Sequence, residues 1–147
     1  AEERYDVRSR IGLIGHTPAL YPSLTLEENT RFVAQLRGAP DGAVRAALDR
    51  VGLAGVRHRR AIQCSHGMQR RAEFARLLIT RPDLVLLDEA HAGLDRHAAD
   101  LVAFLIEDVR NRGGGAMLVS HEHERMAPLV DRILELKNGA VREMESS

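Results

Sequence analysis

The chain has 147 residues, of which 44% are hydrophobic and 29% charged, a composition that suits one compact domain with a core and excludes a disordered or fibrous protein. The 21 basic and 21 acidic residues cancel, aromatic residues make up only 3%, and tryptophan is absent, so neither a basic groove nor a stacking surface for nucleic acid is expected. No apolar run approaches the roughly 18 to 20 residues of a membrane-spanning helix, and residues 1–4 lack the apolar stretch of a secretion signal.

A strand and then a helix are predicted at the start of the chain. The short apolar run 11–15 is closed by glycine, which predicts a buried strand that leads into a loop at His16. Thr25 and Glu28 have the spacing of a capping box, in which a hydroxyl and a carboxylate satisfy each other's free backbone amides. A helix is therefore predicted to begin at Thr25 and to end at Gly38.

Two more helices are predicted to follow. Asp41 is expected to cap one that ends at Gly52, because the apolar residues between them recur at i, i+3, i+4 and i+7. Ser65 is expected to cap the other, which stops before Pro82. Residues 20–80 are therefore expected to be mostly helical.

The pattern then changes to strands. The run 84–87 is continuous, apolar and too short for a helix, which predicts a strand covered on both faces. Asp88 and Glu89 follow at its carboxyl end. An acidic pair at this place is what phosphoryl transfer from a nucleotide needs, since one carboxylate holds magnesium and the next orients the attacking water. A helix-capping pair at a strand end is the alternative interpretation.

The last third of the chain completes an α/β pattern. Asp95 is expected to cap a helix that the glycines 113–115 break, and a buried strand over 116–120 is followed at once by His121. Strand, helix and strand of this length predict a parallel sheet, whose ligands bind beyond the carboxyl ends of the strands. The tail 133–141 is expected to form a hairpin at the sheet edge.

Two further sites are candidates for phosphate contacts. Ser65 and Gly67 place a hydroxyl, a small residue and free amides at a helix start, which is an anion site, although an ordinary serine cap has the same pattern. His121 is placed to reach the acid pair and to bond a terminal phosphate or the attacking water, although a strand-end histidine is often only a polar cap. With one cysteine, no metal cluster is expected among the seven histidines.

Taken in order, these motifs resemble the nucleotide-binding domain of ABC transporters over almost the whole chain. Residues 64–71 resemble the signature motif of that family, 84–89 its Walker B strand, 92–95 its D-loop and 120–121 its switch histidine. Residues 16–22 lie where the family has its Q-loop. The segments 15–18 and 24–29 are similar to ATPase subunits of the haem-exporter and drug-exporter groups.

The resemblance implies a partial P-loop NTPase of the RecA-like type, a parallel sheet with an inserted α-helical subdomain. Residues 1–19 would hold the Q-loop strand, 20–80 the helical subdomain with the signature, and 81–147 the remaining motifs and the hairpin. ATP and Mg²⁺ would be the cofactors, with Glu89 and His121 as catalytic residues.

The implied ligand contacts and partners follow from the same family. Asp88 would bind the metal, and His16, Ser65, Gly67 and Asp95 would contact the nucleotide. The partners would be a transmembrane subunit, which the helical subdomain touches, and a second copy of the ATPase domain, but no nucleic acid. The expected location is cytoplasmic, on the inner face of the cell membrane, and the single cysteine fits that reducing compartment.

One competing interpretation starts from the same acidic pair. Residues 88–91 spell Asp-Glu-Ala-His, the box of one helicase class. A helicase is not expected to have a signature-like helix start before this box or a D-loop directly after it, so Ala90-His91 is interpreted as a variant of the usual ABC sequence. Two other departures from the family are Cys64 in place of leucine and His66 in place of the first glycine.

No P-loop motif, Gly-x-x-x-x-Gly-Lys-Ser/Thr, occurs in the 147 residues, whose only lysine is Lys137. Because the P-loop strand precedes the Q-loop strand in the family, we expect a C-terminal part of the domain, with little ATP binding and negligible hydrolysis alone. The missing strand would leave a sheet edge unpaired, which predicts self-association. A non-catalytic interaction module with the same fold is the alternative function.

Overall fold

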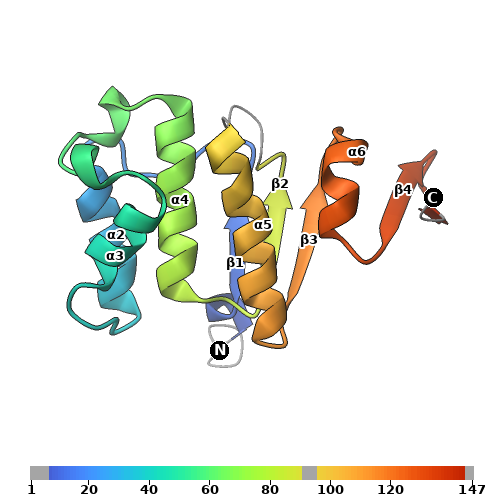
Figure 1. The fold of residues 1–147 in the computed structure, drawn as a ribbon, viewed down its shortest axis with the longest axis horizontal. Coiled ribbons are helices and arrows are strands. Elements are labelled where there is room, and N and C mark those ends of the chain that lie inside the picture. The colour runs from blue at the N-terminus through green and yellow to red at the C-terminus, as the bar shows by residue number, and fades with distance from the viewer. Residues whose placement is uncertain (1–6, 91–95, 145–147) are drawn as a thin grey trace.

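The computed structural model of the protein describes residues 7–90 and 96–144, and Figure 1 shows the arrangement of the elements. In chain order these are β1 (Ile11–Ile14), α2 (Leu26–Leu36), α3 (Ala43–Arg50), α4 (His66–Thr80), β2 (Leu84–Asp88), α5 (Arg96–Asn111), β3 (Gly115–Val119), α6 (His123–Met126), β4 (Ile133–Lys137) and β5 (Ala140–Met144). Apart from the short helix α6, which the sequence does not predict, the order of strands and helices is the predicted one.

Three parallel strands form the central sheet, in the order β1-β2-β3. Ile14 pairs with Leu87, and Leu87 pairs with Leu118, so all three strands end at the same edge of the sheet. The predicted α/β class with a parallel sheet is thereby confirmed. Side chains that follow the three strands must lie at this common edge.

The helical lobe, made of α2, α3 and α4, is inserted between β1 and β2 and lies beside the sheet in Figure 1. Both α2 and α3 pack on α4, which in turn contacts β1 and α5. Leu26, Leu48 and Phe74, one from each helix of the lobe, are almost fully buried and belong to the same core as the sheet. Helix α4 therefore connects the lobe to the sheet.

Two helix caps of the lobe are where the sequence predicts them. Thr25 Oγ1 accepts the Glu28 amide at 3.1 Å, and the Glu28 carboxylate accepts the Thr25 amide at 2.7 Å, which is the reciprocal pattern of a capping box. Ser65 caps α4, since its hydroxyl accepts the Met68 amide at 3.2 Å. Both caps satisfy amides that a helix leaves free at its first turn.

The predicted cap of α3 is wrong. Gly42, not Asp41, is the N-cap residue, and no side chain bonds the first turn. Gly42 has φ 86°, a left-handed conformation that glycine adopts without a steric penalty. The chain therefore turns into the helix one residue later than expected, and the Asp41 side chain is not used.

The sheet is covered by helices on one face only, among the residues that the structure describes. Val85 and Leu87 are buried in the core that also holds residues of α4 and α5, whereas the alternate side chains of the strands face outward. The open sheet face, as we call this surface, carries exposed Ile11, Leu13, Leu84, Met117 and Val119. The prediction that all three strands are buried, and the middle one on both faces, is therefore wrong, because both covering helices lie on the same side.

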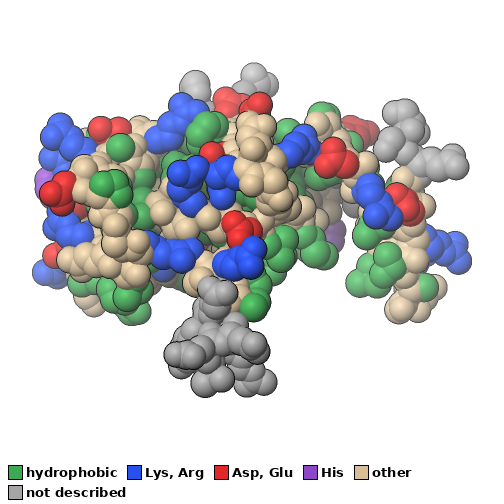
Figure 2. All heavy atoms as spheres, turned by 90° about the horizontal axis from the view of Figure 1, so that it is seen from below, with side chains coloured by type: hydrophobic (Ala, Val, Ile, Leu, Met, Phe, Trp, Pro, Cys, Tyr) green, Lys and Arg blue, Asp and Glu red, His purple; other side chains and the backbone are tan. Residues whose placement is uncertain are grey.

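The C-terminal hairpin forms as predicted but not where it was expected. β4 and β5 pair antiparallel through a turn at Asn138 and Gly139, whose φ angles are 51° and 75°. The hairpin makes its own two-stranded sheet instead of extending the central one, and it stands apart from the body of the molecule in Figures 1 and 2. An antiparallel pair with a two-residue turn bonds internally, so it does not require a third strand.

Candidate functional site

The predicted acid pair and the predicted histidine meet at the carboxyl edge of the sheet. Asp88 is the last residue of β2, Glu89 follows it, and His121 comes two residues after the end of β3. Glu89 Oε1 accepts the His121 amide at 3.0 Å and lies 3.6 Å from His121 Nε2. The geometric prediction for these three residues therefore agrees with the structure, while their chemical roles stay a prediction.

Hydrogen bonds hold both the main chain and the side chain of Glu89. Its amide donates to the Val119 carbonyl at 3.0 Å, which continues the pairing of β2 with β3 by one residue. The Glu89 side chain is only 20% exposed, whereas the His121 side chain is 96% exposed. The carboxylate is thus fixed in place, and the imidazole beside it is open to solvent and to a ligand.

The backbone of Glu89 is strained. Its φ is 48°, in the left-handed region that residues with a Cβ atom rarely adopt. Such a conformation costs about 1 to 3 kcal/mol and persists where surrounding bonds determine it, often at functional sites. Here the hydrogen bonds of Glu89 to Val119 and His121 hold its backbone in this conformation.

The arrangement suits activation of a water molecule near a metal-bound phosphate. A fixed carboxylate such as Glu89 can accept a proton, and an adjacent imidazole can donate a hydrogen bond to developing negative charge. Asp88 is exposed beside it. Mg²⁺ typically takes one or two carboxylates and completes its shell with phosphate oxygens and water, so a single aspartate fits this metal. Within the described part of the chain, no group of three or more histidine, cysteine, aspartate or glutamate side chains could hold a metal without such help.

His16 lies at the same edge of the sheet, two residues after the end of β1. It is exposed, and its carbonyl accepts a hydrogen bond from Arg70 Nη2 at 2.7 Å. The main chain at this position is therefore anchored to α4. The His16 side chain is exposed at this edge of the sheet.

Ser65 and Gly67 occupy the first turn of α4. Ser65 is the exposed cap, and Gly67 is the second residue of the helix. In Figure 1, α4 begins at the end of the molecule toward which the strands point. The start of this helix and the acid pair thus lie at the same end of the molecule. The prediction for Asp95 falls outside the described residues, as does that for His91.

Arg70 and Glu73 are almost fully buried in the middle of α4, and neither is among the residues that the sequence predicts for the site. They form an ion pair with each other and bond the main chain on both sides of Thr17-Pro18. One signal for them exists in the sequence, because 70, 73 and 77 follow the i, i+3, i+7 spacing of a helix face that also carries apolar Leu77. This spacing places the two opposite charges on the same helix face as Leu77, which is the feature that could have drawn attention to them.

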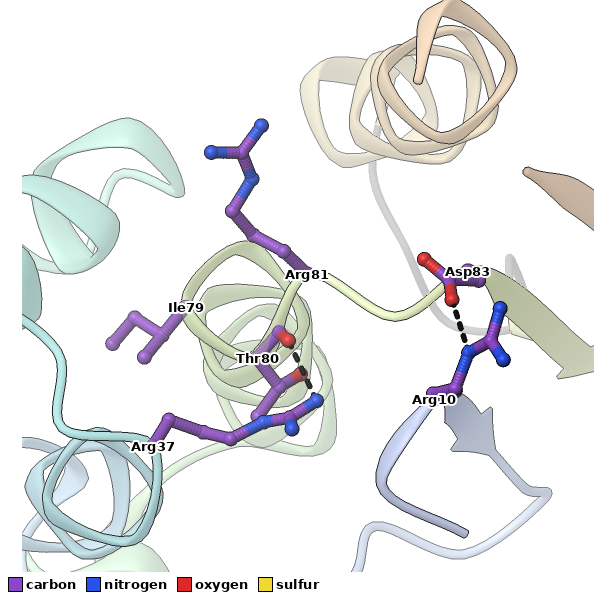
Figure 3. A pocket seen from close by; sticks show the side chains of 6 residues that line it. All are labelled: Arg10, Arg37, Ile79, Thr80, Arg81 and Asp83. Atoms are coloured by element: carbon purple, nitrogen blue, oxygen red, sulfur yellow. Dashed lines mark hydrogen bonds and ion pairs between the residues drawn. The ribbon is translucent and has the colours of Figure 1, made fainter. Parts of the chain in front are cut away.

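A cavity of about 380 Å³ lies at the opposite end of the strands. Figure 3 shows the side chains around it, which are Arg10, Arg37, Ile79, Thr80, Arg81 and Asp83. Arg10 bonds Asp83 at 2.6 Å, and Arg37 bonds the Thr80 carbonyl at 2.9 Å, so two of the three arginines already hold the end of α4 and the start of β2. This cavity does not include any residue of the candidate site.

The chain is similar to known proteins of one family. A family model described as "ABC transporter" matches residues 1–92. The lipoprotein-releasing system ATP-binding protein LolD of Anaeromyxobacter dehalogenans is 40% identical over 136 residues, which is 89% of this chain and 57% of that protein. A fluoroquinolones export ATP-binding protein of Mycobacterium tuberculosis is 36% identical, over 99% of this chain and 48% of its own length.

A third relative and a solved structure agree with these two. The cytochrome c biogenesis ATP-binding export protein CcmA of Mesorhizobium japonicum is 38% identical over 80% of this chain and 57% of its own length. A structure titled "Structure of ATP binding subunit of ABC transporter" superposes with a TM-score of 0.85 at 25% identity, over 97% of this chain and 62% of that one.

The fold is thus that of an ABC ATPase, with a parallel sheet and an inserted helical lobe. The chain belongs to the ABC transporter family, to its ATP-binding part. It spans about half the length of the curated relatives it matches. No helix in the described ranges has both the length and the apolar character needed to cross a bilayer.

Proposed function

We propose that this chain forms part of the ATP-hydrolysing subunit of an ABC exporter. The observation that carries the proposal is the Glu89–His121 contact at the carboxyl edge of the sheet, directly beside Asp88. Export is supported by the names of two relatives, the fluoroquinolones export protein and the cytochrome c biogenesis export protein. The similarity to haem-exporter and drug-exporter ATPases in the segments 15–18 and 24–29 points the same way.

Each residue of the edge has a chemical task in this proposal. Glu89 orients the attacking water and accepts its proton, and His121 donates a hydrogen bond to the terminal phosphate. Asp88 supplies the protein ligand for Mg²⁺, which when bound offsets the negative charge of the phosphates. His16 contacts the nucleotide from the end of β1. Asp95, outside the described residues, keeps the predicted role of a nucleotide contact.

The start of α4 serves a second nucleotide site in this proposal. Ser65 and Gly67 present free amides and the positive end of the helix dipole, which suit the terminal phosphate of a nucleotide held by a second copy. The 147 residues contain no P-loop motif, so we expect the chain alone to bind ATP weakly and to hydrolyse it negligibly. The helical lobe contacts a transmembrane subunit on the cytoplasmic side of the membrane.

The proposal is tested by following backbone amide signals during a titration with Mg²⁺-ATP at millimolar concentration. We expect shifts at the site residues and no shift around the cavity of Figure 3. The site residues are His16, Ser65, Asp88, Glu89 and His121. Omitting Mg²⁺ should remove the shift at Asp88, because the metal links that carboxylate to the phosphates. Shifts confined to residues away from the carboxyl edge would contradict the proposed site.

Phosphate release by the chain alone is measured in parallel, with Glu89→Gln as the matched variant because it keeps the size of the side chain. We expect no turnover above background in either protein. Turnover by the unmodified chain that Glu89→Gln abolishes would support the role of Glu89 but would contradict the expected inactivity of the isolated chain.

We also propose that the chain self-associates. The support is the open sheet face, since parallel sheets are normally covered on both sides and exposed apolar surface favours association. The free edges of β1 and β3 add unpaired backbone groups within the described sheet.

A further inference from the structure

A buried ion pair lies in the middle of α4. The Arg70 side chain is 0% exposed and the Glu73 side chain 5%, and Arg70 Nη1 donates to Glu73 Oε2 at 2.8 Å. Both side chains point from α4 toward the segment that follows β1. The pair is thus placed between the helical lobe and the sheet.

Both members of the pair bond the main chain of residues 15–19. Arg70 donates from Nη1 to the Gly15 carbonyl at 2.6 Å and from Nη2 to the His16 carbonyl at 2.7 Å. Glu73 Oε1 accepts the Ala19 amide at 2.8 Å. The planar guanidinium thereby holds the start of the segment, and the carboxylate holds its end.

This arrangement is a poor way to gain stability. Removing two charges from water costs several kcal/mol per ion, and apolar residues of the same size often do as well or better. Burial raises the pKa of Glu73, although the Ala19 amide and the Arg70 guanidinium act in the opposite direction. Arg70 Nε is buried without a hydrogen-bond partner. The pair is therefore better explained by what it holds in place.

We propose that Arg70 and Glu73 are positioning residues that fix residues 15–19 to α4, so that His16 and the Ser65 turn move as one unit. Ser65 caps the helix five residues before Arg70, and the helix transmits any shift of its first turn to the guanidinium. The inference rests on the proposed function only for the identity of the ligand that His16 and Ser65 contact. The mechanical connection between these two residues rests on the hydrogen bonds of Arg70 and Glu73 alone.

The test compares Arg70→Lys with Arg71→Lys in the 147-residue chain. Lysine keeps the positive charge at position 70 but cannot bond two carbonyls and a carboxylate in one plane. Arg71 is the matched control, since it lies on the same helix and, among the described residues, bonds the Val51 and Gly52 carbonyls at the long distances of 3.4 and 3.5 Å. Hydrogen exchange of the Ala19 amide is the measurement.

We expect Arg70→Lys to speed exchange at Ala19 on the order of tenfold, without an equal change in the core amides of α2, and Arg71→Lys to leave it unchanged. Glu73→Gln keeps an oxygen acceptor for the Ala19 amide but removes the counter-charge of Arg70, so we expect a smaller increase in the exchange rate of Ala19. If Arg70→Lys does not fold, Glu73→Gln takes its place in the comparison. Equal rates in all variants, or a uniform increase across the protein, would overturn the proposal.

Coupling between His16 and the Ser65 turn needs a second measurement. Ser65→Ala removes the cap of α4 and should shift the backbone signals of His16 in the unmodified chain, but not in the Arg70→Lys background. A merely stabilising role for Arg70 predicts the same shift in both backgrounds and would refute the coupling. Because nucleotide is absent from these experiments, their failure would leave the Mg²⁺-ATP titration as an independent test of the proposed function.

Discussion

Glu89 combines three structural features. Its amide extends the pairing of two strands, its side chain accepts the His121 amide, and its backbone is left-handed. A glycine would meet the backbone requirement without strain but would leave no carboxylate. A carboxylate at this position therefore comes at the expense of local backbone stability, as the proposed role of Glu89 requires.

This strain can be measured by comparing Glu89→Gly with Glu89→Ala. Both variants lose the bond to the His121 amide, so their difference isolates the backbone term. We expect the glycine variant to be more stable by about 1 kcal/mol, measured as the free energy of unfolding in urea with equal slopes.

The same two substitutions at Glu107 provide the control. Glu107 is an exposed residue of helix α5, where alanine should be the more stable replacement by about 1 kcal/mol. An identical order of stability at both positions would show that the φ of Glu89 carries no strain.

At the scale of single residues, the sequence is informative where the interaction is local. The Thr25 capping box and the Ser65 cap depend on neighbours three residues away, so their spacing suffices to predict them. Asp41 was a reasonable cap by residue type, but the backbone angle of Gly42 decided the helix start. The bonds of Arg70 to Gly15 and His16 span more than fifty positions, so spacing alone could not reveal these two partners.

At the scale of elements, the connection from α5 to β3 is unusually tight. A Cβ atom at Gly114 would lie 2.3 Å from the Asp83 carbonyl oxygen and 2.8 Å from Val109 Cγ1. The close approach lets the Gly115 amide bond that same carbonyl at 2.8 Å, which starts the pairing of β3 with β2. The register of these two strands thus depends on a residue without a side chain.

Gly114→Ala should therefore lower the free energy of unfolding by about 2 kcal/mol, because backbone atoms cannot move aside as a flexible side chain can. Gly115→Ala is the matched control, since its nearest neighbour would be Leu84 Cδ1 at 3.9 Å. We expect the control to change stability by less than about 0.5 kcal/mol. Chemical denaturation of the two variants side by side measures the difference, and equal losses would contradict this account.

The apolar strands show the limit of prediction at this scale. A continuous apolar run such as 84–87 indicates a strand but not which of its faces is covered, since that depends on where distant helices pack. The hairpin shows the same limit, because the turn at Asn138 and Gly139 determines its pairing but not its neighbours. The carboxyl-edge site was predictable because parallel strands must end together.

At the scale of the whole molecule, the open sheet face and the helical lobe differ in how their apolar residues are arranged. Leu13 and Met117 belong to a continuous apolar surface across the sheet, whereas Leu36 of the lobe is exposed at the end of α2. A continuous apolar surface can bury more area in a contact than a single exposed leucine, so we expect association through the open sheet face.

Light scattering should accordingly give a mass above that of one chain, rising with concentration. The double substitution Leu13→Glu and Met117→Glu is expected to return it to the mass of one chain, because two carboxylates would be buried in the contact. Leu36→Glu is the control, with an exposed leucine of the lobe replaced, and should leave association unchanged. A single-chain mass for the unmodified protein at every concentration would refute the proposal.

The strained backbone at Glu89 has a further consequence for how this sequence can drift over generations. Glycine at that position would relieve the strain but would also remove the carboxylate that accepts the His121 amide, so folding alone gives little preference between the two residues. Under the proposed function, demand for the reaction is then what favours the acid, and sequences released from that demand are expected to change at this position.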